Sequence, residues 1–402
     1  MKLLVVGSGG REHAVIRKLK ENKEIEKIYC APGNGGISAD AECVDIKATD
    51  KENMVKFAKE NAIDFCVVTP DDPLALGMVD EMEEAGIPCF GPKANAAIIE
   101  ASKAFSKDLM KKYGIPTADY ETFDNEKEAL HYIEEKNTFP IVIKADGLAL
   151  GKGVLICETL DDAKTALREM MVEHVFGLSG NKVVVEEFMT GKEVSVLAFT
   201  DGNVVKPMIS SMDHKRAYDN DEGLNTGGMG TIAPSPYYTK EIAETCMETI
   251  FLPTVKAMNA EGRTFKGCLY FGLMLTPKGP RVVEYNCRFG DPETQVVLPL
   301  LNSDLLTIMK ACHDGTLKDV DVVWSEEACA CVVEASGGYP VKYEKGFEIH
   351  GLDENGQHDG VIVYHAGTKK ENGKFYTNGG RVLGITAKGA TLQDALDKAY
   401  EA

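Results

Sequence analysis

The chain has 402 residues, more than one hydrophobic core commonly serves, so two to four domains are expected. Its formal net charge of −19 argues against nucleic-acid binding, which needs a basic surface, and requires bound anions to be held by local groups. With 44% hydrophobic residues and no apolar run near the ~18 residues that cross a bilayer, the composition is that of a globular protein outside the membrane.

Cysteine usage indicates a reducing compartment. The eleven cysteines are scattered, and the nearest pair, Cys329 and Cys331, lacks the CxxC spacing of a metal or redox motif. We therefore expect a cytoplasmic protein. The first residues, MKLLVVGSGG, have a short apolar run that breaks at glycines, and we interpret them as a strand and turn rather than a signal peptide.

Strands and helices are expected to alternate over the first hundred residues. Strand-like runs lie at 2–7, 25–31 and 64–69, and helical patterns lie at 11–22, near 54–60 and at 78–85. This βαβ order predicts a parallel sheet wrapped by helices. A further helical stretch begins near residue 92 and includes SKAFSKDLMKKYG.

The rest of the chain predicts two more units. A compact α+β module is expected from 118 to 190, with strands at 118–123, 140–145, 153–157 and 182–188 and helices at 125–136 and 160–171. Strand runs at 192–206 and 264–286 follow, separated by a loop at 211–236 and a helix at 239–261, and helices at 293–313 close this region. Short strands and glycines fill the chain from about 328.

We therefore predict a multidomain fold of the α/β and α+β classes. Its parts are a parallel α/β domain at 1–102, a central domain at 103–316 with a small lid module at about 118–190, and a β-rich domain at 317–402.

Two glycine-rich turns follow predicted strands near the N-terminus. Backbone amides of Gly7–Gly10 lie between a strand and a helix, where they can hold an anion, and a second turn lies at 33–36. Both are expected at the carboxyl ends of parallel strands, beside one crevice. Glu12 replaces the third glycine of a dinucleotide fingerprint, which disfavours a nicotinamide enzyme. Tight turns without a ligand are the alternative.

The segment from Lys144 to Gly153 resembles a P-loop only superficially. Gly147 and Gly151 are one residue too close, and Gly153 stands where a Ser or Thr would bind Mg²⁺. Because the segment joins two strands, we interpret it as a lid over nucleotide phosphates, with Lys152 on the lid and Lys144 on the strand. A plain hairpin remains possible.

Acidic and amide side chains recur on two later strands. The run 183–196, read as one strand, carries Glu186, Glu187 and Glu193, which suit adenine and ribose contacts but in isolation fit a solvated surface. In the run 283–294, residues two apart share a face, so Glu284, Asn286 and Arg288 are expected on one side, with Tyr285 and Cys287 packed on the other.

A carboxylate beside an amide oxygen suits Mg²⁺, and an adjacent arginine suits a carboxylate ligand. A chance polar face is the alternative for this strand. The loop at 213–230 places three potentially cationic side chains before a glycine-rich turn, which suits phosphate transfer as well as it suits a solvated loop.

Together these segments resemble the ATP-grasp superfamily and, within it, the phosphoribosylamine–glycine ligases, also called glycinamide ribonucleotide synthetases. The resemblance covers essentially the whole chain and is most specific in DHKRAYDNDEGLNTGGMG and VEYNCRFGDPETQ. Two features depart from it: the strand at 268–275 carries no second acid for a metal, and the chain ends at AYEA, earlier than the resemblance leads us to expect.

The resemblance implies a set of site residues. For ATP it implies Lys103, Lys144, Gly151, Lys152, Gly153, Glu186, Glu187, Phe188 and Glu193, and for Mg²⁺ or Mn²⁺ it implies Glu284 and Asn286. For the substrates it implies Gly9, Gly10, Asn34, Gly35, Gly36 and Arg288, the last for the glycine carboxylate, and for the chemical step Asp213, Lys215 and Arg288.

It also implies an activity: ATP-dependent joining of glycine to 5-phosphoribosylamine through glycyl phosphate, by a monomer that needs neither nucleic acid nor a membrane. Three other readings remain. Another ATP-grasp ligase or carboxylase is the nearest. A nucleotide-binding protein without catalysis is disfavoured by Lys144, Glu284 and Asn286, and a nicotinamide oxidoreductase by the broken glycine fingerprint.

Overall fold

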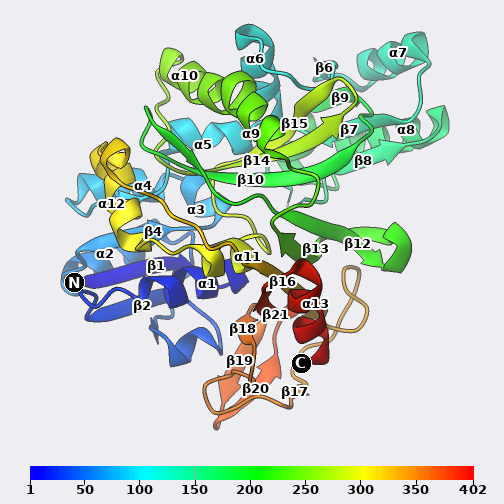
Figure 1. Ribbon diagram of the computed structural model, residues 1–402. Coiled ribbons are helices and arrows are strands. Elements are labelled where there is room, and N and C mark those ends of the chain that lie inside the picture. The colour runs from blue at the N-terminus through cyan, green and yellow to red at the C-terminus, as the bar shows by residue number, and fades with distance from the viewer. Residues whose placement is uncertain (150) are drawn as a thin grey trace.

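A computed structural model describes residues 1–149 and 151–402. The described strands form five sheets, and both termini lie at the surface of the molecule (Figure 1). The expected parallel α/β unit, central unit with a small module, and β-rich unit are all present. No described helix has both the length and the apolarity to span a bilayer.

The N-terminal sheet is parallel, as expected, with strand order β3-β2-β1-β4-β5. Its strands are β1 (Lys2–Gly7), β2 (Lys27–Pro32), β3 (Glu42–Cys43), β4 (Phe65–Val68) and β5 (Cys89–Phe90). The helices that accompany it are α1 (Gly10–Leu19), α2 (Lys51–Glu60), α3 (Asp71–Ala75) and α4 (Met78–Glu84). Because the strand order reverses beside β1, the turns after β1 and β2 lie at the kind of edge where α/β proteins bind ligands.

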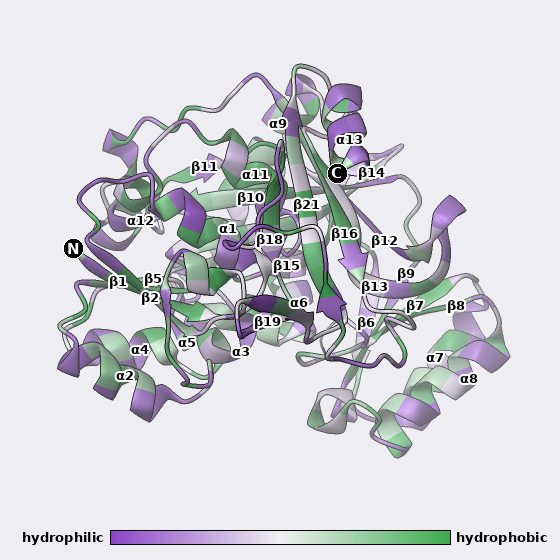
Figure 2. Ribbon diagram, turned by 90° about the horizontal axis from the view of Figure 1, so that it is seen from below, coloured by the Kyte–Doolittle hydropathy of each residue, from purple (hydrophilic) through white to green (hydrophobic). Residues whose placement is uncertain are grey.

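The small module is a four-stranded antiparallel sheet in the order β6-β9-β7-β8. It contains β6 (Tyr120–Phe123), β7 (Ile141–Ala145), β8 (Val154–Cys157) and β9 (Val183–Glu187), with helices α7 (Glu126–Lys136) and α8 (Leu160–Leu167). Apolar side chains of these helices and strands form a core of their own. The outer helices α2, α7 and α8 carry both hydrophobic and hydrophilic residues (Figure 2).

The interpretation of 183–196 as one strand is wrong, whereas the separate strands expected at 182–188 and from 192 are confirmed. The chain forms β9 and then β10 (Lys192–Thr200), which belong to different sheets. The break falls at Gly191, which has φ +155° and whose Cα approaches the carbonyl oxygen of Leu275 too closely for a side chain. The polar stretch at 190–193 interrupts the apolar runs at this break, and Gly191 within it adopts a backbone conformation that favours glycine.

The central sheet is antiparallel in the order β11-β10-β14-β15. Its further strands are β11 (Val205–Pro207), β14 (Gly267–Thr276) and β15 (Gly279–Asn286), and helices α5 (Ala94–Ala101), α6 (Lys103–Tyr113), α9 (Lys240–Cys246) and α10 (Leu252–Ala260) lie beside it. Buried residues of this sheet and of the N-terminal sheet belong to the same two core clusters, so packing is continuous between the units.

The remaining strands form a five-stranded sheet, β12-β13-β16-β21-β18, and a small sheet, β17-β20-β19. Their bounds are β12 (Met212–Tyr218), β13 (Glu222–Ala233), β16 (Ala328–Ala335), β17 (Glu348–Ile349), β18 (Ile362–His365), β19 (Thr368–Glu371), β20 (Lys374–Thr377) and β21 (Arg381–Gly389). Helices α11 (Thr294–Val297), α12 (Leu305–Asp314) and α13 (Leu392–Glu401) complete this part.

The loop expected at 211–236 is therefore wrong, because β12 and β13 form a hairpin there. Its glycines and charges hide the strand pattern, and β13 is paired with β16, about a hundred residues later in the chain. The resulting sheet spans the domain boundary predicted near residue 316.

Candidate active site

Two buried lysines converge on one buried glutamate where the small module meets the central sheet. Lys144 Nζ on β7 lies 2.8 Å from Glu186 Oε1, and Lys107 Nζ on α6 lies 3.1 Å from Glu186 Oε2. Burial acts to raise the pKa of Glu186, but the charges of Lys144 and Lys107 outweigh it and lower that pKa. Burial lowers the pKa of Lys107 to about 8. Two cations beside one carboxylate leave a positive excess that suits an anion.

Lys103 begins α6 directly beside the connection between β7 and β8. Its Nζ donates to the carbonyl oxygen of Gly147 at 2.9 Å, and burial lowers its pKa. Asp146 holds the same helix end, since its Oδ1 accepts the Ala104 amide at 2.7 Å and the Ser102 hydroxyl at 3.0 Å. The first residues of the connection and the start of α6 are therefore bound to each other.

The predicted lid joins two strands, β7 and β8, as expected from its sequence. Gly151 has φ +73° and open space where a side chain would lie, and Lys152 is exposed. Gly153 is buried, and its carbonyl accepts the Ala145 amide at 2.8 Å. The lid prediction also covers Leu150, which lies outside the described residues.

The other acids of this region have separate surroundings. Glu187 Oε1 accepts from Arg281 Nη1 at 2.9 Å and from the Asp119 amide at 3.2 Å, away from the lysines. Phe188 follows β9 and is 38% exposed. Glu193, on β10, lies 3.5 Å from Lys215 Nζ. The structure therefore places Glu186 in the lysine cluster and Glu193 in a second polar cluster on the central sheet.

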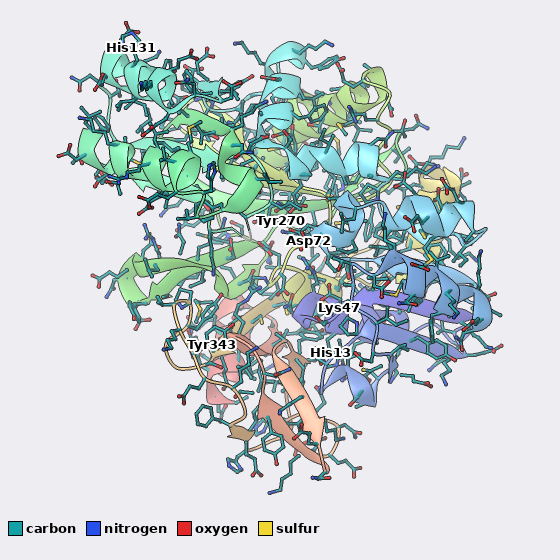
Figure 3. The ribbon with its side chains drawn as sticks, turned by 180° about the vertical axis from the view of Figure 1, so that it is seen from behind. His13, Lys47, Asp72, His131, Tyr270 and Tyr343 are labelled. Carbon is teal, nitrogen blue, oxygen red and sulfur yellow. The ribbon has the colours of Figure 1, made fainter. Side chains whose placement is uncertain are left out.

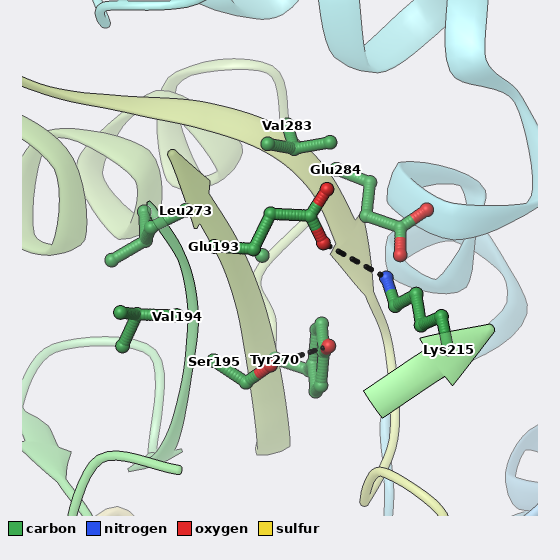
Figure 4. Close-up of a pocket in the computed structure, with 9 residues that line it drawn as sticks. Glu193, Val194, Ser195, Lys215, Tyr270, Leu273, Val283 and Glu284 are labelled. Atoms are coloured by element: carbon green, nitrogen blue, oxygen red, sulfur yellow. Dashed lines mark hydrogen bonds and ion pairs between the residues drawn. The ribbon is translucent and has the colours of Figure 1, made fainter. Parts of the chain in front are cut away.

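Strand β15 shows the expected alternation. Tyr285 and Cys287 are buried in the core, whereas Glu284 lines the pocket shown in Figure 4. Burial acts to raise the pKa of Glu284, but the charges of Lys215, Lys144 and Lys103 outweigh it and lower that pKa. Glu284 is thus an ionised carboxylate facing several cations.

Glu100, near the end of α5, binds three groups that follow Glu284. Its Oε1 accepts from Asn286 Nδ2 at 3.0 Å and lies 3.1 Å from Arg288 Nη2, and its Oε2 accepts the Cys287 amide at 2.8 Å. The structure thus brings Asn286 and Arg288 together through a residue that the sequence analysis missed. Its only signal was a single acid within the otherwise uncharged helix ANAAIIEA.

Lys215 lies between carboxylates contributed by three strands. Figure 4 shows Lys215 beside Glu193 of β10 and Glu284 of β15. Asp213 lies two residues before Lys215 on β12. The charge of Asp213 is the main cause that raises the pKa of Lys215, and burial raises the pKa of Asp213. Lys215 is therefore a fixed cation beside Glu284.

The polar face of β15 fits a hard divalent cation. Glu284 offers a carboxylate, and because Asn286 turns its nitrogen toward Glu100, its oxygen faces away from that carboxylate. Among the described residues no group of three or more His, Cys, Asp or Glu side chains is arranged to hold a metal. A cation here would thus take few protein ligands and complete its shell with phosphate and water, as Mg²⁺ commonly does.

The two N-terminal glycine turns contact each other and the C-terminal unit. Asn34 Nδ2 donates to the carbonyl oxygens of Ser8 at 2.9 Å and His365 at 2.7 Å. The Gly9 amide donates to Glu12 Oε2 at 2.6 Å, so the side chain of Glu12 caps the start of α1. Side chains at Gly35 and Gly36 would overlap Lys369 and the His365 ring. These residues join the units, and their predicted substrate contacts stay a prediction.

The sequence analysis missed three further residues that lie around this site, namely Lys107, Tyr270 and Glu293. Lys107 lies four residues after Lys103 on one helix, a spacing that shares a face and could have indicated it. Tyr270, near the middle of the molecule in Figure 3, and Glu293 gave no local signal.

Comparison with known proteins matches most of the chain to the domain models of one family. The phosphoribosylglycinamide synthetase models match as the N domain over residues 1–100, the ATP-grasp (A) domain over 101–294 and the C domain over 329–402. A phosphoribosylamine–glycine ligase of Caldanaerobacter subterraneus is 50% identical, with 100% of this chain and 95% of that protein covered.

Solved structures agree at the level of the whole chain. The crystal structure of the phosphoribosylamine–glycine ligase from Thermotoga maritima is similar with a TM-score of 0.87 and 33% identity, covering 100% of this chain and 96% of the other. The biotin carboxylase domain of the Hydrogenobacter thermophilus 2-oxoglutarate carboxylase, in complex with MgADP, has a TM-score of 0.75 and 19% identity, covering 100% of this chain and 89% of the other. At that identity the second likeness concerns the fold alone.

Proposed function

The chain belongs to the phosphoribosylamine–glycine ligase family, and we propose how its central site joins glycine to 5-phosphoribosylamine with ATP. The products are glycinamide ribonucleotide, ADP and phosphate, in de novo purine biosynthesis. A carboxylate is a poor electrophile, so one oxygen of glycine first attacks the γ-phosphorus, and the bond to ADP breaks. The amine of phosphoribosylamine then attacks the acyl carbon of glycyl phosphate, phosphate leaves, and the amine loses a proton.

The nucleotide lies between the small module and the central sheet in this proposal. Lys144, Lys107 and Lys103 surround the position of the phosphates, where their partners Glu186 and Gly147 hold them in place. Gly151, Lys152 and Gly153 cover the phosphates from the lid. The strand end at 186–188 borders the adenine, and Glu193 reaches the ribose.

Glu284 and the oxygen of Asn286 would hold Mg²⁺ or Mn²⁺, which neutralises charge on the triphosphate when it is bound. Lys215 adds a fixed positive charge beside Glu284, where the carboxylate approaches the γ-phosphate. Asp213 keeps Lys215 protonated, because its charge raises the pKa of that lysine. Arg288, held by Glu100, binds the glycine carboxylate.

No protein nucleophile is needed for this reaction. Catalysis depends on alignment of the two substrates, which can remove about 7–11 kcal/mol of barrier, and on charge neutralisation. Closure of the lid keeps water from glycyl phosphate. Gly9, Gly10 and the turn at 33–36 border the phosphoribosylamine site, at the edge where β1 and β2 end.

We further propose a cytoplasmic monomer. The eleven cysteines are free, which fits a reducing compartment. The mass measured by light scattering tests the monomer.

The observation that carries the proposal is Glu284 lying among Lys215, Lys144 and Lys103, beside Asn286. The test is ADP release with Mg²⁺, with phosphoribosylamine generated from ribose 5-phosphate and ammonia. We expect release only when glycine and phosphoribosylamine are both present. ADP release unaffected by leaving out glycine would reject the ligase and favour another ATP-grasp reaction.

A further inference from the structure

The segment from His365 to Thr368 joins the C-terminal unit to the glycine turn at 33–36. Asn34 Nδ2 donates to the His365 carbonyl oxygen at 2.7 Å, and the Gly35 amide donates to the Thr368 carbonyl oxygen at 3.1 Å. The segment connects β18 to β19, and the turn follows β2. A side chain and a backbone amide of the turn therefore bind one short piece of the C-terminal unit.

Both donors of the Asn34 side chain are used within the chain. Its nitrogen donates to the carbonyl oxygens of His365 and Ser8, and its Oδ1 accepts the Ile37 amide at 2.9 Å. An asparagine amide has two N–H donors, so neither is left for a substrate. The side chain of Asn34 thus connects the two glycine turns to the C-terminal unit.

A buried histidine of α1 binds the same segment through its backbone. His13 Nδ1 accepts the His365 amide at 2.9 Å, and His13 Nε2 lies 2.9 Å from Asp40 Oδ2. Because a backbone amide only donates, Nδ1 carries no proton, and Nε2 carries one and donates it to Asp40. Burial lowers the pKa of His13, which favours this neutral form. The single acceptor nitrogen of His13 is therefore used on His365.

The ring of His365 is held as well. Its Nε2 lies 2.7 Å from the carbonyl oxygen of Gly356, which can only accept, so Nε2 carries the proton. Nδ1 then accepts the Thr368 hydroxyl at 2.9 Å. The ring also occupies the space that a side chain at Gly36 would need. The amide, the carbonyl oxygen and both ring nitrogens of His365 thus have partners, which leaves the segment one position against the turn.

We propose that His13 is a positioning residue for phosphoribosylamine, an assignment that rests on the proposed function. His13 Nδ1 holds the His365 amide, and the His365 carbonyl oxygen holds Asn34. Asn34 in turn sets the turn at 33–36, which borders this substrate. The lysines around the nucleotide belong to β7 and α6, so the loss of His13 Nδ1 affects one substrate and leaves nucleotide binding unchanged.

Two substitutions separate the two ring nitrogens of His13. The Oδ1 of an asparagine can replace His13 Nδ1 and accept the His365 amide, whereas the Nε2 of a glutamine can replace His13 Nε2 and donate to Asp40. His13→Asn therefore keeps the bond to His365, and His13→Gln loses it. His131, which lies on α7 far from His13 in Figure 3, has a side chain that is 72% exposed, and His131→Gln is the matched control.

The measurements compare the product with the nucleotide. Calorimetry gives the Kd for glycinamide ribonucleotide and the Kd for ADP, and thermal unfolding identifies variants that do not fold. We expect the Kd for glycinamide ribonucleotide to rise at least about tenfold in His13→Gln and less than about threefold in His13→Asn. The Kd for ADP should change less than about threefold in both, and His131→Gln should match the parent enzyme.

Equal product affinities of the two His13 variants overturn the assignment, and so does an equal loss of affinity for product and ADP. If either variant does not fold, Asn34→Asp decides, because it places an acceptor beside the carbonyl oxygens of Ser8 and His365. Weaker binding of the product alone is then expected, and unchanged product binding overturns the assignment. A parent enzyme that binds ADP but not glycinamide ribonucleotide instead rejects the proposed function.

Discussion

Glu100 Oε1 accepts a hydrogen bond from Asn286 Nδ2 at 3.0 Å, and this bond orients the amide so that its oxygen faces away from Glu100. The same oxygen lies 3.1 Å from Arg288 Nη2. One buried carboxylate therefore orients both a proposed metal ligand and the proposed partner of the glycine carboxylate, although it lies about 190 residues earlier in the chain.

Glu100→Gln should weaken metal use without unfolding the protein. The amide keeps the shape of the side chain but removes the charge that holds Arg288, and residues that support metal ligands typically change metal affinity 10–100-fold. We expect the Mg²⁺ concentration for half-maximal activity to rise about tenfold. Activity measured against Mg²⁺ concentration checks this, with Glu327→Gln, from an exposed ion pair with Lys388, as control. An unchanged Mg²⁺ requirement contradicts the role of Glu100.

Lys144→Met should reduce nucleotide affinity. The change removes one of the two cations on Glu186 and with it the positive excess that faces the phosphates. We expect the Kd for ADP, measured calorimetrically, to rise at least about tenfold. Lys182→Met, in an exposed lysine of the same module, should leave that Kd unchanged. Equal affinities of the two variants would remove Lys144 from the nucleotide site.

Acidification should loosen the contact between the N-terminal and C-terminal units. His365 is fully buried, its Nε2 lies 2.7 Å from the Gly356 carbonyl oxygen, and its backbone amide donates to His13 Nδ1 at 2.9 Å. Burial lowers the pKa of His365 to about 4. Between that value and its ordinary 6.5 the unfolded chain binds a proton that the folded one does not, so stability falls as the pH falls through this window.

The expected loss for His365 is about 2 kcal/mol between pH 7.5 and 5. Urea unfolding at both pH values measures it, and His365→Gln provides the comparison because it removes the titrating group. The pH-dependent loss should be smaller in the variant by about that amount. Equal pH dependence in both proteins would show that His365 does not contribute.

Gly36→Ala should destabilise the same contact. A Cβ at Gly36 would overlap the ring of His365, which is fully buried. Overpacking of this kind costs about 1–3 kcal/mol. Gly337→Ala is the matched control, because a Cβ there meets nothing within 4 Å. Denaturant unfolding compares the two variants, and similar stabilities would contradict the tight packing of Gly36.

Local patterns predicted much of the fold and part of the site. Alternation in 283–288 placed Glu284 and Asn286 opposite Tyr285 and Cys287, because the period of a strand needs no knowledge of its neighbours. The βαβ order predicted the parallel N-terminal sheet in the same way.

Features that depend on distant partners could not be predicted. The hairpin at 212–233 belongs to a sheet because its second strand, β13, pairs with β16. Glu100 contacts Asn286 only because α5 packs against β15. Glu293, which precedes α11, contacts the site through Tyr270 of β14. In each case the nearby sequence shows only a charge or a glycine, and the contact that determines its role is made with a separate secondary-structure element.

The central claim is that Glu284 and Asn286 present a divalent cation to the triphosphate. A crystal structure with Mg²⁺ and a non-hydrolysable ATP analogue tests it most directly. We predict one oxygen of Glu284 and Oδ1 of Asn286 at about 2.1 Å from the metal, with phosphate oxygens completing the octahedron. A nucleotide bound with both side chains turned away from its phosphates would contradict the account.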